Sequence, residues 1–448
     1  MEDEYIIKVK RVVGDLTAQS PGEPAYLYVK KSYFANVTDS LQSLPSHLQL
    51  IDASEQTALP GLIDMHVHLT REEPGAEINL APLYLAHGVT SVRDVGSDLQ
   101  AVKRMRSRIA DGEVPGPRVF YCGPQLNGKA FRPGMCNLQT ADEAREKVEE
   151  LYKQGAHALK IYDHLRPEIS NVIVEEARNF NLPVCAHLGK TTARQAISFG
   201  ISGLEHLTSL IFDLFDEEVP NPFSQDLFRE ISEIDVDSSA ARQLCDSVVS
   251  RGIFIDPTLV VYDRIVRFPE LKSGEQEWPF IPGILGSYWL DRMGKFTGKW
   301  QHEDFVIARS GFEKLKVWLR FLQSRGAQII AGTDTPNPYL VPGQSLLDEI
   351  KLLAKAGLPN EMAIGAATFV AAKALKQTKE IGSIETGKRA DFLLVAGNPQ
   401  DDISYIERIV TVFKGGVRYQ PEALMSMATQ MAMNGSMLGS GIHSRAGL

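Results

Sequence analysis

Short apolar runs alternate with helical patterns through most of this chain. From Gly61 onward, runs such as GLIDMHVH and VTSVRDV are each followed by a segment with apolar residues at i, i+3 and i+4. This rhythm predicts buried parallel strands that are covered by amphipathic helices. We expect strands near residues 62, 91, 119, 159, 184, 203, 254 and 330. Eight such units favour an α/β fold in which a (β/α)8 barrel of the TIM type closes on itself, rather than an open sheet.

The two ends of the chain have a different pattern. Residues 1–60 alternate short β-like runs with Pro, Gly and Ser, and residues 378–422 repeat this texture. Neither end sustains a helical period, so we expect both to combine into a small β-sandwich domain beside a barrel of residues 61–377. Residues 423–448 are rich in Met, Gly and Ser and are expected to form a mobile tail.

Two long insertions interrupt the barrel pattern. Residues 207–236 are rich in Phe and in acidic residues, and residues 258–304 are rich in aromatic residues. Loops of this length at a barrel mouth are often lids or substrate walls. For any single aromatic residue, packing of the insertion on the barrel is at least as good an interpretation.

Composition and charge narrow the class of protein. The chain has 448 residues, a net charge of -9 and no clustered Lys/Arg surface, which argues against a nucleic-acid partner. It contains no run of 18 apolar residues and no signal-peptide pattern, so we expect no membrane partner. Four cysteines without a C-x-x-C spacing suit a reducing compartment. We therefore expect a cytoplasmic protein that acts on a small-molecule substrate.

Polar residues at the ends of apolar strands form the candidate site. Active sites of such barrels lie at the carboxyl ends of the strands. His66 and His68 lie one residue apart in the first strand, so their side chains share a face and can share a metal ion. The other residues of this kind are Lys160 in the fourth strand, His187 after the fifth, His206 after the sixth and Asp334 after the eighth.

Each of these residues also has a simpler interpretation. A strand-end histidine is more often a hydrogen-bonded structural residue than a ligand, Asp334 could cap a turn, and Lys160 could form a salt bridge. The coincidence of all six at one end of the barrel weighs against separate explanations. A lysine in an apolar strand is costly unless its charge is paired or removed. Carboxylation by carbon dioxide would convert Lys160 to a carbamate that can bridge two cations.

The ordered motifs of the chain resemble the amidohydrolase superfamily over about residues 1–420. They include LPGLIDMHVHL, GVTSVRDVG, ALKIY, LPVCAHL, GLEHLTSL, IIAGTDT and GSIETGKRADFLLVAGNP. Within the superfamily the chain is most similar to the prolidase-like branch, which contains Xaa-Pro dipeptidases, ochratoxinase and, more distantly, imidazolonepropionase. Because members are commonly oligomeric, the resemblance also implies a homo-oligomer.

The resemblance implies two divalent metal ions. Imidazole and carboxylate donors suit zinc, and also manganese, cobalt or iron, so ligand type alone does not name the metal. Of these, we expect zinc. The buried metal would be held by His66, His68 and Asp334, and the exposed metal by His187 and His206. Carboxylated Lys160 and a hydroxide would bridge the two.

The resemblance also assigns catalytic roles. Asp334 would take the proton of the attacking hydroxide and pass it to the leaving amine. Tyr162 would face the substrate, and a purely packing role for it is equally compatible with the sequence. A barrel with a vestigial site would be expected to lack a ligand, and none is missing here.

Two departures from the family pattern bear on the reaction. Many relatives carry Gly-Gly-His after the third strand, whereas GPQLNGKAFRPG contains no histidine. Deaminase members place a glutamate three residues after the strand-five histidine, where this chain has Lys190. We therefore expect hydrolysis of a C–N amide or peptide bond in a dipeptide-like or N-acyl amino acid substrate, with Arg264, Arg267 and Arg292 as candidates for its carboxylate. A lactonase, organophosphate hydrolase or cyclic amidohydrolase with the same centre is the alternative.

Overall fold

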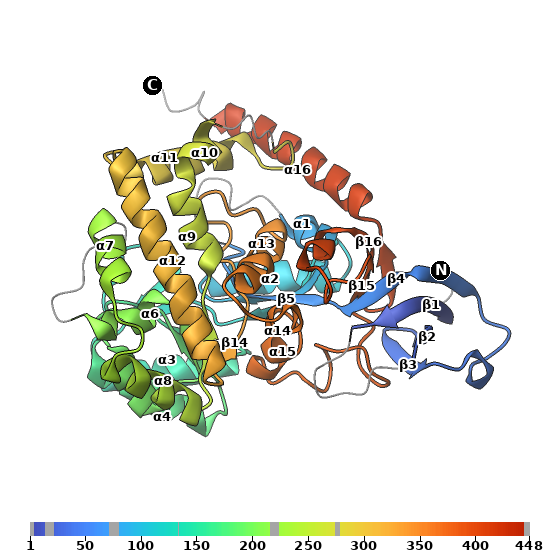
Figure 1. Ribbon diagram of the computed structural model, residues 1–448, viewed down its shortest axis with the longest axis horizontal. Coiled ribbons are helices and arrows are strands. Elements are labelled where there is room, and N and C mark those ends of the chain that lie inside the picture. The colour runs from blue at the N-terminus through green and yellow to red at the C-terminus, as the bar shows by residue number, and fades with distance from the viewer. Residues whose placement is uncertain are drawn as a thin grey trace.

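The molecule consists of a barrel of parallel strands and a separate β-sheet (Figure 1). The computed structural model describes residues 4–13, 22–70, 80–132, 134–215, 224–273 and 278–442. Helices surround the barrel, and the separate sheet projects from one side of it with the N-terminal strands outermost. The predicted α/β fold class is confirmed.

Eight strand positions line the barrel. Seven of the predicted positions lie within a strand, and the eighth, near residue 330, lies directly after the end of one. The strands are β5 (Leu62–Val67), β6 (Val89–Asp94), β7 (Arg118–Tyr121) with its continuation β8 (Gln125–Asn127), β10 (Leu159–Ile161), β11 (Val184–Ala186), β12 (Gly203–Glu205), β13 (Phe254–Asp256) and β14 (Gln328–Ile329). Neighbouring strands are parallel, and β9 (Met135–Asn137) pairs with β8 at the edge.

Backbone hydrogen bonds close the barrel where the regular ladders stop. Met65 N donates to Ala331 O at 3.0 Å, which joins β5 to the segment after β14. His157 N donates to Tyr121 O at 2.9 Å, which joins β7 to the segment before β10. Closure brings the carboxyl ends of all strands to one rim, as in other α/β barrels.

Amphipathic helices cover the outside of the barrel. Helix α3 illustrates the local signals: Thr140 and Glu143 form a reciprocal capping box, and Ala144, Val148 and Leu151 are buried. The covering helices are α1 (Ala81–Ala86), α2 (Leu99–Ala110), α3 (Ala141–Lys153), α4 (Pro167–Asn179), α5 (Ala193–Phe199), α8 (Ser239–Ser250), α12 (His302–Ser324), α13 (Gln344–Lys355), α14 (Asn360–Ala366) and α15 (Phe369–Ala374).

The two insertions fold as short helices at the barrel rim. They contain α6 (Thr208–Ile211), η2 (Phe212–Leu214), α7 (Gln225–Glu233), α9 (Leu259–Val266), α10 (Phe268–Ser273) and α11 (Gly283–Thr297). Trp278 and Trp289 pack edge to face with ring centroids 5.7 Å apart, and both contact Tyr339. The packing interpretation therefore holds for these two tryptophans.

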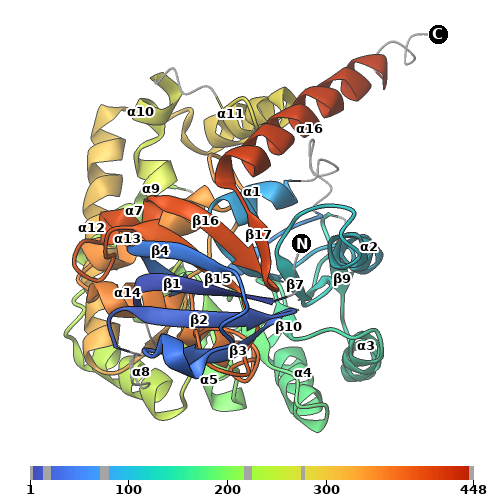
Figure 2. The same cartoon turned by 90° about the vertical axis from the view of Figure 1, so that its right-hand side faces the viewer.

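Strands from both ends of the chain form one continuous sheet, seen face-on in Figure 2. Its order is β17-β16-β15-β4-β1-β2-β3, so the predicted association of the two termini is confirmed. Leu27, Phe34, Phe392 and Phe413 belong to its apolar core. The elements are β1 (Glu4–Val12), β2 (Ala25–Lys30), β3 (Tyr33–Thr38), η1 (Leu41–Ser43), β4 (Leu50–Pro60), β15 (Phe392–Ala396), η3 (Ile403–Glu407), β16 (Ile409–Lys414) and β17 (Val417–Tyr419).

Much of the stretch expected to be a mobile tail lies in helix α16 (Pro421–Ile442), which crosses above the barrel in Figures 1 and 2. Leu424, Ala428 and Ala432 are buried, and Leu424 packs with Leu85 and Ala86 of α1. Residues 443–448 of the expected tail lie outside the described residues. Within the described residues, no helix combines the length and apolar character that a membrane span requires.

Candidate metal centre

Strand β5 directs two histidines into the barrel mouth. His66 and His68 are only 2% and 3% exposed. The Nδ1–H of His66 donates to Glu205 Oε2 at 2.8 Å, and the Nδ1–H of His68 donates to Gly96 O at 2.9 Å. Both acceptors lack a proton to give, so each ring carries a proton on Nδ1 and presents Nε2 to the site. Both histidines are therefore held in the tautomer that a metal ligand needs.

Asp334 faces the same two Nε2 atoms. Its Oδ1 lies 3.0 Å from His68 Nε2 and 3.5 Å from His66 Nε2, and it accepts no hydrogen bond from the described residues. Atoms that all carry lone pairs repel one another at these separations unless a proton or cation lies between them. The backbone of Asp334 has a φ of 62°, an uncommon conformation that turns its carboxylate inward.

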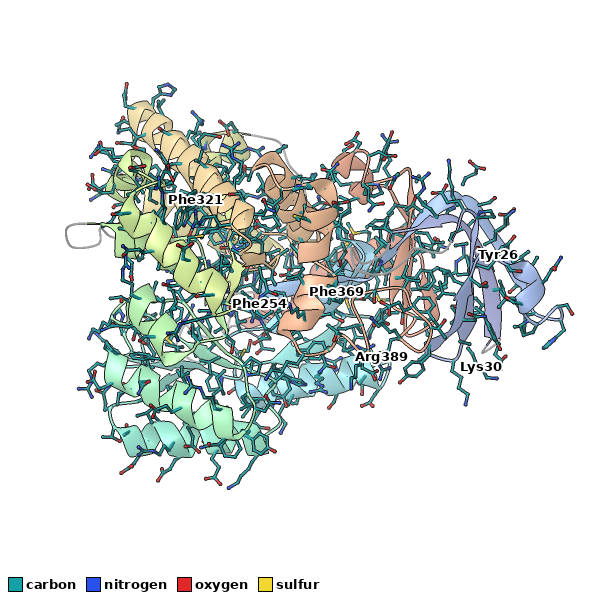
Figure 3. The ribbon with its side chains drawn as sticks, turned by 60° about the horizontal axis from the view of Figure 1, so that its bottom comes forward. Tyr26, Lys30, Phe254, Phe321, Phe369 and Arg389 are labelled. Atoms are coloured by element: carbon teal, nitrogen blue, oxygen red, sulfur yellow. The ribbon has the colours of Figure 1, made fainter. Side chains whose placement is uncertain are left out.

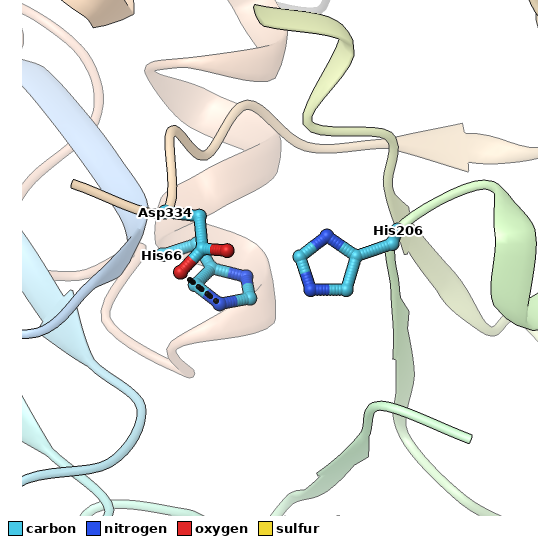
Figure 4. A group of neighbouring side chains, drawn as sticks. All are labelled: His66, His206 and Asp334. Atoms are coloured by element: carbon cyan, nitrogen blue, oxygen red, sulfur yellow. Dashed lines mark ion pairs between the residues drawn. The ribbon is translucent and has the colours of Figure 1, made fainter. Parts of the chain in front are cut away.

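Two further histidines face this cluster. His206 follows β12 with a φ of 64°, and its Nδ1 lies 2.7 Å from Thr258 Oγ1. The ring of His187 lies 4.7 Å from that of His206, centroid to centroid. Ligand atoms of His66, His206 and Asp334 all lie within 4.8 Å of one another, as Figure 4 illustrates.

Lys160 lies in β10 and is 1% exposed. No described residue forms a hydrogen bond or ion pair with its Nζ, so the salt-bridge interpretation of this lysine is not supported. An isolated buried ammonium is costly, whereas a carbamate would convert it into a bidentate ligand beside the histidines.

The six predicted ligands and Tyr162 line one cavity of about 240 Å³. The donor set fits divalent-metal binding: two imidazole nitrogens lie within 3.5 Å of Asp334 Oδ1, and the buried amine of Lys160 has no hydrogen-bond partner among the described residues.

Burial and charge set the protonation of this cluster. Burial, reinforced by Lys160, lowers the pKa of His187 to about 3. Burial opposes ionisation of Asp334, but the neighbouring His66 and His68 outweigh it and hold its pKa well below the usual value. Burial and Lys160 oppose protonation of His66, but Asp334 and Glu205 outweigh them and raise its pKa to about 9. Because a cation binds neutral imidazole and ionised carboxylate, metal binding at Nε2 of His66 would displace a proton.

A buried charge network behind His66 was missed from sequence. Glu205 Oε1 accepts from Arg93 Nη2 at 2.6 Å, and Arg93 Nε donates to Met65 O at 2.7 Å. Asp256 Oδ2 lies 3.3 Å from His66 Nδ1. Burial raises the pKa of Asp256 to about 7. The available signal was an acidic residue at the end of each apolar strand, in GLEH and FIDP.

Both insertions contribute walls to the cavity, as expected for loops at the barrel mouth. Thr208 Oγ1 and the Tyr262 hydroxyl are 2.9 Å apart and join the two insertions. The insertion residues that line the cavity are Thr208, Phe212, Val261, Tyr262, Ile265, Arg292, Met293 and Phe296.

Only one of the three candidate arginines lines the cavity. Arg264 is buried and paired with Asp263 and Asp348, and Arg267 is paired with Asp263. Arg292 lines the cavity and lies over the Phe296 ring. The structural roles of Arg264 and Arg267 correct the sequence prediction, because their carboxylate partners come from this chain.

Arg132, which the sequence did not single out, also lines the cavity. Its Nη2 donates to Gln125 Oε1 at 2.9 Å, and its guanidinium lies 5.8 Å from the centre of the Tyr162 ring. Arg132 occurs in the loop that lacks the family's histidine. This loop therefore still contributes a cationic side chain to the cavity, from an arginine in place of the histidine.

Comparison with known proteins gives a consistent picture. Residues 57–418 match the family model described as the amidohydrolase family. A dihydroorotase from Syntrophobacter fumaroxidans is 30% identical over 152 residues, which span 32% of this chain and 32% of that protein. The chain thus aligns with about a third of the length of this relative.

Several solved structures share the fold. A bottromycin amidohydrolase superposes with a TM-score of 0.73 at 20% identity, covering 96% of this chain and 91% of that one. An Xaa-Pro dipeptidase with bound methionine gives 0.67 at 22% identity, covering 93% and 100%. Ochratoxinase from A. niger gives 0.68 at 20% identity, covering 94% and 96%. At these identities the likeness establishes a common architecture.

Proposed function

This chain belongs to the amidohydrolase family, and from that membership we propose that it is a binuclear metal-dependent hydrolase of a C–N amide or peptide bond. The substrate class that we propose is a dipeptide or an N-acyl amino acid. One observation carries the proposal: Nε2 of His66 and Nε2 of His68 both face Oδ1 of Asp334, and the buried amine of Lys160, which lines the same cavity, has no hydrogen-bond partner among the described residues.

In this proposal six residues hold two divalent cations, most readily zinc. When bound, the cations would acidify a water molecule and polarise the scissile carbonyl. The buried site is assigned to His66, His68 and Asp334, and the exposed site to His187 and His206, with carboxylated Lys160 contributing to both. Hydrogen bonds orient three of the four imidazoles: that of His66 with Glu205, that of His68 with Gly96 and that of His206 with Thr258.

Asp334 is assigned the proton transfers. Its low pKa makes it a carboxylate before reaction, so it can accept the proton of the attacking water. It would then donate this proton to the leaving nitrogen as the C–N bond breaks. The products are a carboxylate and a free amine.

Tyr162 and two arginines are assigned to the substrate. Tyr162 lines the cavity and its ring lies 4.8 Å from that of His187, so its hydroxyl can contact a substrate held at the metals. A substrate carboxylate would be bound by Arg132 or Arg292, both of which line the same cavity.

Replacing Lys160 by Ala tests the centre. We expect the variant to lose bound metal and kcat/KM for amide substrates to fall by more than about 100-fold. Loss of a residue that only orients a ligand costs at most roughly 100-fold. Added acetate should restore part of the activity, because it can supply two oxygens in the vacated space. Metal content and hydrolysis of a panel of acyl amino acids are the measurements. Lys190→Ala, at an exposed position after His187, is the matched control. Full metal occupancy and undiminished activity in Lys160→Ala would contradict the proposal.

Hydrolysis of a cyclic amide is the second candidate, and the similarity to a protein named dihydroorotase favours it. The same centre could also attack lactones or phosphotriesters, since specificity lies in the loops. A panel of dipeptides, N-acyl amino acids, dihydroorotate, lactones and phosphotriesters would rank these classes by kcat/KM.

We also propose that the protein acts in the cytoplasm as a homo-oligomer. Fractionation of cells that produce it, and the native mass of the purified protein by light scattering, test these two points separately.

A further inference from the structure

A second polar cavity lies at the other end of the barrel, where strand β7 begins. Its volume is about 440 Å³. It is bounded by β7, by α2, by the segment between α15 and β15, and by the end of β16, so it joins the barrel to the terminal sheet. Figure 3 shows Arg389 at this junction. The charged and aromatic residues that line it are Tyr33, Arg106, Arg118, Phe120, His157, Glu380, Arg389 and Lys414.

The cavity has more cations than carboxylates. Arg118 Nη2 pairs with Asp391 Oδ2 at 3.0 Å. Arg389 Nε pairs with Glu380 Oε2 at 3.1 Å. No carboxylate among the described residues lies within ion-pair distance of the remaining two cations, Arg106 and Lys414.

The surroundings of these two cations do not neutralise them. Arg106 Nη1 lies 3.1 Å from His157 Nε2, and burial together with Arg106 lowers the pKa of His157 to about 4, so this imidazole is neutral. Burial and the neighbouring Arg118 lower the pKa of Lys414 to about 8, and Asp391, which pairs with Arg118, offsets only part of this effect. An ammonium in such a place would gain stability from an anion.

We propose that this cavity binds one small phosphate-bearing anion. Two uncompensated positive charges match a phosphate dianion, and the four cations come from α2, β7, β16 and the segment before β15, which suits a tetrahedral group better than a planar carboxylate. The bound anion would link Arg106 and Arg118 of the barrel to Lys414 of the terminal sheet. Phe120 and Tyr33 provide apolar walls for a group esterified to the phosphate.

Inorganic phosphate, added to the full-length protein, is the first probe. We expect saturable binding of one phosphate per chain in equilibrium dialysis, with a dissociation constant below about 1 mM. Phosphate at 10 mM should raise Tm by about 2 °C relative to chloride at equal ionic strength. Phenyl phosphate should bind more tightly than phosphate if the aromatic walls contact the ester group.

Variants locate the binding. The double variant Arg106→Met/Lys414→Met should weaken phosphate binding at least tenfold. Arg106→Met alone should also weaken binding, and because Arg106 is at an exposed position of α2, this single variant should have little effect on folding. Arg104→Met/Lys30→Met removes two exposed cations outside the cavity and should bind phosphate normally. His206→Ala disables the metal centre, which could itself bind phosphate, and should also retain binding. Absence of saturable binding up to 10 mM, unchanged affinity in the double variant, or loss of binding in His206→Ala alone would overturn the proposal.

Discussion

His206 depends on Thr258 for the orientation of its ring. The 2.7 Å contact between Nδ1 and Oγ1 leaves Nε2 facing the other ligands. Both residues have a positive φ, 64° for His206 and 44° for Thr258, which is uncommon for residues with a side chain. Strained conformations of this kind persist where the surrounding structure fixes them, and they are frequent at functional sites.

Thr258→Val should therefore weaken metal binding without removing a ligand. The valine retains the shape of threonine and removes the hydroxyl that forms the hydrogen bond with His206 Nδ1. We expect a loss of metal affinity of about 10- to 100-fold, measured by competition with a chelator. Thr258→Ser retains the hydroxyl and should keep affinity within about threefold. Equal affinity in the valine and serine variants would show that the hydroxyl does not orient the ligand.

Arg132→Met tests recognition of a substrate carboxylate. A charged hydrogen bond contributes about 1.5–3 kcal/mol, so KM for an N-acyl amino acid should rise by about 10- to 150-fold. KM for the corresponding carboxamide, which has no carboxylate, should change little. Steady-state kinetics on the matched pair of substrates gives the comparison, and Arg166→Met, at an exposed position, is the control. A similar rise in KM for both substrates would exclude a role in binding the carboxylate.

At the scale of elements, short strands and the insertions build the cavity. Strands β11, β12 and β13 have three residues each. His187 directly follows β11, His206 directly follows β12, and Thr258 lies two residues after β13. The insertions then add Phe212, Tyr262 and Phe296 as walls. This division places the proposed metal ligands at the ends of the barrel strands and these cavity walls on the connecting segments.

Helix α16 provides a test of how one element is held. Leu424 is 3% exposed and packs on Leu85 and Ala86 of α1. Leu424→Ala should weaken this docking by about 2–4 kcal/mol. Limited proteolysis near residue 420 should then become faster, while Met433→Ala, at a side chain that is 56% exposed, should leave the rate unchanged. Equal cleavage rates in all three proteins would mean that α16 is not held by Leu424.

At the scale of the whole molecule, Lys414 places a destabilising positive charge where the terminal sheet meets the barrel. Its pKa is about 8 in the folded protein and about 10.5 in the unfolded chain. Between these values the unfolded state binds more protons, so the contribution of Lys414 to the free energy of unfolding rises with pH. Below pH 8 its destabilising effect is complete, and above about pH 10.5 it is absent.

Lys414→Met should therefore stabilise the protein at pH 7 by about 1–3 kcal/mol, and this gain should shrink as the pH rises to 10. Denaturant unfolding of wild type and variant at pH 7 and 10, in phosphate-free buffer, measures the difference at each pH. A gain that does not depend on pH would show that the ammonium charge is not its cause. Lys30→Met, at an exposed lysine of the same sheet, is the control.

Local sequence patterns were enough to predict the positions of the barrel strands and the six residues that we assign to the metals. Strand and helix periods are local, and a ligand that ends a buried strand of a barrel has only one rim to face. His66 and His68 were thus identifiable from a short apolar run, and the later ligands from the same rule.

The other charged side chains that line the cavity could be recognised only in the folded chain. Arg264 and Arg132 look alike as residues, yet Arg264 is neutralised by Asp263 and Asp348 while Arg132 lines the cavity. The partnership of Glu205 with Arg93 and His66, and the docking of α16 on α1, also join segments far apart in the chain. The partners of a charged or apolar side chain are set by closure of the barrel and packing of its insertions, and local sequence patterns do not contain that information.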